Sequence, residues 1–187
     1  MVFSLISRLV NGVKGGVVGG LKGTADIASS IINVVKNTTV TTLKETGGFV
    51  KEAIDVPASL VKGALTGVGE IGATTVKSLK GVVNGVVQGF MESGWEQKPA
   101  IQGAVGQAIH SAKELGLDIG EAAVSSVMGA VNGVKQVGGD TVSATKTAVI
   151  TALATAKEIS GDAFNSVEES LSAGVEGAKE IIEEIKN

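Results

Sequence analysis

A repeat of eleven residues runs through the sequence, and it limits the possible folds more than any other feature. In the first half, large aliphatic residues recur at every eleventh position: Val10, Leu21, Ile32, Leu43, Ile54, Leu65, Val76 and Val87. Eleven residues make three helical turns at about 3.67 residues per turn, whereas the period of two that a strand needs is absent. The repeat therefore predicts an all-α fold of long amphipathic helices.

The second half keeps the period in its own phase and with smaller apolar residues. Its large members are Ile109, Val131, Val142, Leu153 and Phe164. With the first series they form one apolar stripe, which we expect to face lipid or a partner. Lys14, Lys36 and Lys80 share a register at the edge of the stripe, where lysine stems can lie along an apolar surface while the ammonium reaches water. They are candidate interfacial lysines, and ordinary solvated lysines are the alternative reading.

The clearest break in the helical pattern is the segment 93–99, which contains Gly94, Trp95 and Pro99. Glycine and proline together favour a turn, so we expect an N-terminal arm over 1–92 and a C-terminal arm over 100–187. Weaker breaks at 47–48 and 138–140 would divide the arms into four segments. The expected arrangement is a helical hairpin or an elongated four-helix arrangement, with Trp95 either plugging the turn or anchoring at an interface.

Glycine accounts for 27 of the 187 residues, and each glycine inside a helix costs about 1 kcal/mol relative to alanine. Such helices need external support from lipid or from other helices. Several glycines are spaced four apart, which lets helix backbones approach closely. The candidates for close helix packing are Gly12, Gly16, Gly20, Gly81, Gly85 and Gly89.

Charge is distributed unevenly along the chain. Residues 1–94 contain nine basic and six acidic residues, whereas residues 95–187 contain seven basic and thirteen acidic residues. A basic front is typical of a segment that seeks anions, and the even alternative is that charge only keeps the chain in solution. The longest uncharged stretches, 99–112 and 122–134, are shorter than the roughly 18–20 residues of a membrane span. We therefore expect a cytoplasmic protein, peripheral to a membrane or lipid surface.

The residue types leave little for catalysis. The chain has no cysteine and no tyrosine, and His110 is its single histidine, so no cysteine or second histidine completes a metal site around it. We expect no enzyme activity, no cofactor and no metal site. Nucleic-acid binding is not expected either, because the isoelectric point is near 5.3 and aromatic residues do not alternate with basic ones.

Two segments resemble a known class of repeats. Residues 76–89 (VKSLKGVVNGVVQG) and 43–50 (LKETGGFV) are similar to the eleven-residue repeats of synucleins and perilipins, which also combine Val, Thr, Ala, Gly and Lys. The basic front and acidic end are similar to those of synuclein. The resemblance implies helices that form on anionic membranes or lipid droplets.

These observations favour a non-catalytic protein that binds a lipid surface, membrane or droplet, through amphipathic helices. The alternative is a self-assembling structural protein, a homo-oligomer that forms filaments, tubes or a coat through eleven-residue seams and glycine contacts. A third reading is a four-helix bundle in solution that binds a partner or an apolar ligand. The first would gain helicity on anionic vesicles, and the second would form large particles without lipid.

Overall fold

The computed structural model describes residues 2–22, 27–45, 55–72 and 76–187. This part of the chain forms nine helices and no strand, which confirms the all-α prediction. The helices are α1 (Val2–Leu21), α2 (Ile27–Glu45), α3 (Asp55–Glu70), α4 (Val76–Glu92), α5 (Gln97–Glu114), α6 (Ile119–Gln136), α7 (Thr141–Ile159), α8 (Gly161–Gly174) and α9 (Ala178–Lys186).

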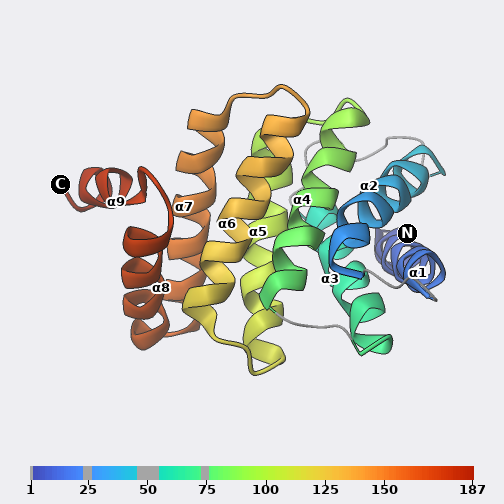
Figure 1. The fold of residues 1–187 in the computed structure, drawn as a ribbon, viewed down its shortest axis with the longest axis horizontal. Helices are drawn as coiled ribbons and strands as arrows, with labels where there is room; N and C mark the ends of the chain where they lie inside the picture. The colour runs from blue at the N-terminus through green and yellow to red at the C-terminus, as the bar shows by residue number, and fades with distance from the viewer. Residues whose placement is uncertain (1, 23–26, 46–54, 73–75) are drawn as a thin grey trace.

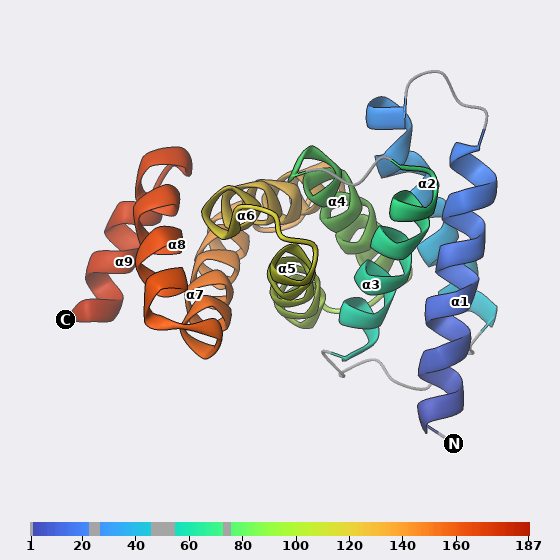
Figure 2. The ribbon, with the colours of Figure 1, turned by 90° about the horizontal axis from the view of Figure 1, so that it is seen from below.

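The helices form a two-layer stack that advances along one axis. Helices α1, α3, α5, α7 and α9 pack side by side in one layer, and α2, α4, α6 and α8 pack in the other. Consecutive helices join the layers, so each helix contacts its neighbours in sequence and the helix two places away. The two chain ends lie at opposite ends of the long axis (Figures 1 and 2).

This arrangement corrects the expected hairpin of two long arms and the four-helix alternative. The predicted turn at 93–99 overlaps the loop between α4 and α5, and the break at 138–140 falls between α6 and α7. The break at 47–48 lies outside the described residues. Further turns after α3, α5 and α7 were not expected, and they shorten every described helix to 20 residues or fewer.

The turns recur at twice the sequence period. Glycines with positive φ follow four successive helices at intervals of 22 residues, Gly72, Gly94, Gly116 and Gly138. At Gly116 the amide of Leu117 donates to the carbonyl of Ala112 across the turn (2.9 Å), which is the glycine-dependent ending that stops a helix. Two eleven-residue units therefore make one helix and its turn, because a glycine in the left-handed region ends the helix after every second unit.

The last helices begin at side-chain caps. Asp118 accepts a hydrogen bond from the amide of Glu121 (2.8 Å), and 22 residues later Asp140 accepts from the amide of Ser143 (3.1 Å). Ser160 caps α8 in the same way, through the amide of Ala163 (3.0 Å). Each cap satisfies an amide that the first helical turn leaves without a partner, so it fixes the residue at which the next helix starts.

The core lies between the two layers and consists mostly of valine, alanine and leucine side chains. Phe90 and Trp95 meet edge to face in it, with ring centroids 4.8 Å apart. Trp95 is 9% exposed, so it fills the turn between α4 and α5 as a plug.

Glycines bring parallel helices of one layer together. A Cβ added at Gly63 on α3 would lie 2.5 Å from the carbonyl oxygen of Val10 on α1. One at Gly129 on α6 would lie 2.5 Å from the carbonyl oxygen of Lys80 on α4. At these positions only a glycine lets one helix rest on the backbone of the helix two places earlier.

Candidate functional site

The apolar stripe lies mostly inside the stack. Six of its members are buried, namely Leu21, Leu43, Leu65, Val87, Ile109 and Leu153. Five are half-buried, namely Val10, Ile32, Val76, Val131 and Phe164. Val142 is 80% exposed, and Ile54 lies outside the described residues. Most of the stripe therefore faces the protein's own core, because each helix packs against neighbours in both layers.

Two of the three candidate lysines join the first two helices to the next two. Lys14 Nζ on α1 lies 2.5 Å from Glu70 Oε1 on α3, and Lys36 Nζ on α2 lies 3.6 Å from Glu92 Oε1 on α4. The second pair repeats the first 22 residues later. Both pairs are partly exposed, so each contributes between about 0 and 1 kcal/mol. Lys80 is half-buried on α4.

The six glycines named above lie on both sides of α2. Gly12, Gly16 and Gly20 line the face of α1 toward α2, where a Cβ at Gly20 would come within 2.6 Å of Val34. Gly81, Gly85 and Gly89 line the face of α4 toward α2, where a Cβ at Gly89 would come within 2.6 Å of Thr39. Helix α2 is thus held between two glycine faces.

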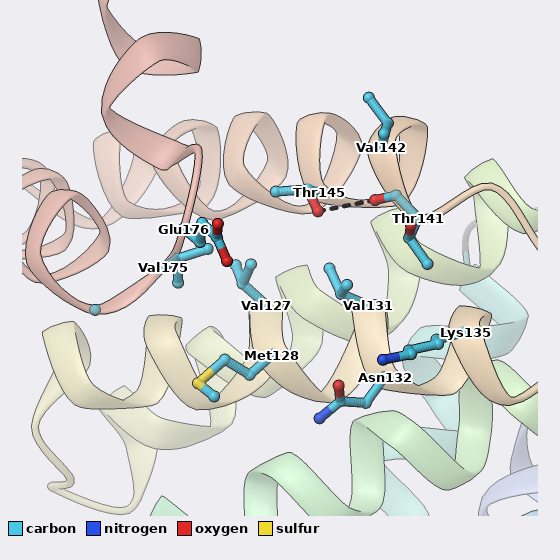
Figure 3. Close-up of a pocket in the computed structure, with 11 residues that line it drawn as sticks. Val127, Met128, Val131, Asn132, Lys135, Thr141, Val142, Thr145, Val175 and Glu176 are labelled. Carbon is cyan, nitrogen blue, oxygen red and sulfur yellow. Dashed lines mark hydrogen bonds between the residues drawn. The ribbon is translucent and has the colours of Figure 1, made fainter.

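A recess of about 580 Å³ opens between α6, the start of α7 and the link from α8 to α9 (Figure 3). Val131 lies between α6 and α7, and Val127 lies near Val175 at one end of the recess. Lys135 and Glu176 add one charge of each sign to the lining. The lining is apolar and brings together no nucleophile and base, so it can contact an apolar group but offers no catalytic pair.

Two further recesses lie on other faces. One of about 780 Å³ runs over α4, α6 and α8. Another of about 230 Å³ lies at the C-terminal end, between α7, α8 and α9. The exposed large apolar side chains of the described chain are Leu115, Met128, Val142, Ile150 and Ile185. The repeat singled out only Val142 among them, since exposure at the other four depends on where each helix ends and what packs beside it.

The two ends of the stack carry opposite charge. Residues 2–22 and 27–45, which include α1 and α2, have five basic residues against one acidic residue, Glu45, a formal charge of +4. Residues 161–187, which include α8 and α9, have seven acidic residues against Lys179 and Lys186, a formal charge of −5. Residues 55–159 between them have eight basic and nine acidic residues. The molecule is therefore strongly dipolar along its axis.

Within the described ranges, no three histidine or acidic side chains lie close enough together to hold a metal ion. His110 Nε2 lies 3.9 Å from Glu158 Oε2 on the surface. No helix in the described part of the chain is both long enough and apolar enough to cross a membrane.

The sequence matches no protein-family model, and no curated protein is significantly similar to it.

Proposed function

We propose that this is a non-catalytic protein that binds reversibly to an anionic lipid surface, a cytoplasmic membrane face or a lipid droplet. Helices α1 and α2 are the binding element. The observation that carries the proposal is the formal charge of +4 on these two helices at one end of the stack. A basic residue near an anionic membrane contributes about 1 kcal/mol to binding.

The end position lets α1 and α2 separate from the stack without dismantling it. Their main contacts are with each other, with α3 and with α4. Separation uncovers aliphatic side chains that are now buried, such as Leu9, Val13 and Val17 on α1. An uncovered apolar face flanked by lysines is the arrangement that lies in a membrane interface.

The ion pairs Lys14–Glu70 and Lys36–Glu92 control this separation. On a lipid surface, headgroup phosphates replace the two carboxylates as partners of the lysines. Each carboxylate competes with lipid for one lysine, so removing both favours the lipid-bound form.

Co-sedimentation with vesicles of phosphatidylcholine and phosphatidylglycerol tests the proposal, with phosphatidylcholine alone as the neutral comparison. The wild-type chain binds the anionic vesicles and not the neutral ones. R8Q/K22Q, which removes two exposed charges from the N-terminal end, weakens binding by about 2 kcal/mol, roughly thirtyfold. The matched control K98Q/K113Q removes two exposed charges from α5 and changes binding much less. Equal losses in the two variants would contradict a specific role of α1 and α2.

A second pair of variants tests the separation step. E70Q/E92Q removes both acidic partners of the lysines and strengthens vesicle binding. E96Q/E114Q removes two exposed carboxylates near α5 and serves as its control. If both pairs strengthen binding alike, general charge explains the effect and the helices need not separate.

A second candidate function is self-assembly into an extended homo-oligomer. The opposite charges at the two ends favour it, since a repeat stack that ends without a polar cap can continue into another copy. Sedimentation velocity without lipid, over a series of protein concentrations, tests it. A single monomer boundary at every concentration would exclude it.

A further inference from the structure

Helix α1 has an outer face on which no other helix of the described chain rests. Arg8, Asn11, Gly15, Gly19 and Lys22 follow one another at intervals of three or four residues, and all five are exposed. A Cβ added at Gly15 or Gly19 would meet no atom within 4 Å. This face is basic at both ends and flat between them.

The opposite end of the stack is acidic and has an apolar groove. The groove of about 230 Å³ lies between α7, α8 and α9 and includes Ile150 and Ile185. These side chains are 40% and 51% exposed. Glu169 on α8 and Glu183 on α9 are exposed at the same end.

We propose that copies of this chain associate head to tail, with the outer face of α1 of one copy against the α8–α9 end of the next. The occupant of each end is thus a second copy. Formal charges of +4 and −5 at the two ends make them complementary, and complementary charge fixes the orientation of association. The middle of the stack has nearly balanced charge, so side-by-side contacts gain no such attraction.

Glycine spacing supports the same geometry. Within the stack, Gly63 and Gly67 of α3 rest on the backbone of α1. Gly15 and Gly19 repeat that four-residue spacing on the free face of α1, so the backbone of a neighbouring copy can approach equally closely. Because each copy uses two different faces, association continues into an open chain of copies unless rotation closes a ring.

The inference rests on the self-assembly function and specifies its interface. The test uses sedimentation velocity of the full chain at low ionic strength, about 10 mM, where the Debye length is about 30 Å. R8E/K22E reverses charge at the N-terminal end, and E169K/E183K reverses it at the C-terminal end. Each variant alone weakens association at least about tenfold. The matched controls K98E/K113E and E96K/E114K around α5 keep wild-type association, and circular dichroism verifies that all variants are folded.

Mixing the two end variants gives the decisive result. The reversed N-terminal end of one variant is acidic, and the reversed C-terminal end of the other is basic, so the mixture regains association that neither variant shows alone. No recovery on mixing would overturn the head-to-tail interface. A wild-type chain that stays monomeric at low salt would overturn both the interface and the assembly function.

The apolar groove provides an independent readout. I150S/I185S changes two exposed side chains in the groove and weakens association, whereas L115S/V142S changes two exposed side chains elsewhere and does not. Assembly that persists in R8E/K22E and I150S/I185S would leave self-assembly standing and exclude this interface. E169K/E183K also separates assembly from lipid binding, because it leaves every basic residue of α1 and α2 in place.

Discussion

At the residue scale, glycine plays three distinct roles in this chain. Gly116 ends a helix at φ 69°, Gly129 rests on the backbone of another helix, and Gly15 lies on an open face. Helix propensity treats the last two alike, at about 1 kcal/mol each against alanine. The structure separates them, because a methyl group has room at Gly15 and none at Gly129.

Gly129→Ala and Gly15→Ala should therefore change stability in opposite directions. Gly129→Ala places a Cβ 2.5 Å from the carbonyl oxygen of Lys80 and destabilises by about 1–3 kcal/mol. Gly15→Ala meets no atom within 4 Å and stabilises by about 0.4–1 kcal/mol. Urea unfolding followed by circular dichroism measures both. Stabilisation by both substitutions would show that α4 and α6 are not in close contact.

At the element scale, the repeating unit is one helix with its glycine turn and its acidic cap. Gly138 ends α6, and Asp140 accepts hydrogen bonds from the amides of Val142 and Ser143 to start α7. The cap sets where the apolar face of α7 begins relative to the core. A shifted start would rotate that face, so the unit controls register as well as stability.

Asp140→Ala should destabilise the protein by about 1 kcal/mol, within a range of about 0.5–2 kcal/mol. The substitution leaves the two amides at the start of α7 without their side-chain acceptor. Asp140→Asn keeps an acceptor oxygen and should cost only a few tenths of that amount. Thermal and urea unfolding measure the difference. Equal losses for alanine and asparagine would assign the effect to charge at the helix start and not to the cap.

At the scale of the whole molecule, each helix contacts only its near neighbours in the two layers. Stability in such a stack is approximately a sum over local interfaces. Helices α1 and α9 lie at the ends of one layer, whereas α4, α5 and α6 have neighbours on both sides. The ends can therefore open while the middle stays folded, as binding by α1 and α2 requires.

Hydrogen exchange should follow this order. Amides of α4, α5 and α6 should exchange slowest, and those of α1 and α9 fastest, because terminal helices open without breaking the central interfaces. Mass spectrometry of peptides from each helix measures the gradient. Uniform protection from α1 to α9 would indicate all-or-none unfolding and would argue against partial opening on lipid.

The sequence alone predicted the helices and several of their contacts with the surroundings. The eleven-residue period predicted helicity, and Gly94 with Pro99 predicted the turn after α4. It did not predict the turns at Gly72 and Gly116, because a glycine in a chain this glycine-rich looks the same whether it ends a helix or lies within one. The 22-residue spacing of the turn glycines was present as a signal but was overlooked beside its half period.

The period of apolar residues by itself determined that this chain is helical and amphipathic, because only a helix brings every eleventh residue to one side. Only the tertiary structure decided that the stripe faces inward, since burial at Leu21 or Ile109 depends on helices distant in sequence that fold back beside it. The same is true of Ile150 and Ile185, which stay exposed because the stack ends at α9. Local spacing fixes a helix and its faces, whereas the partner of each face is a property of the assembled layers.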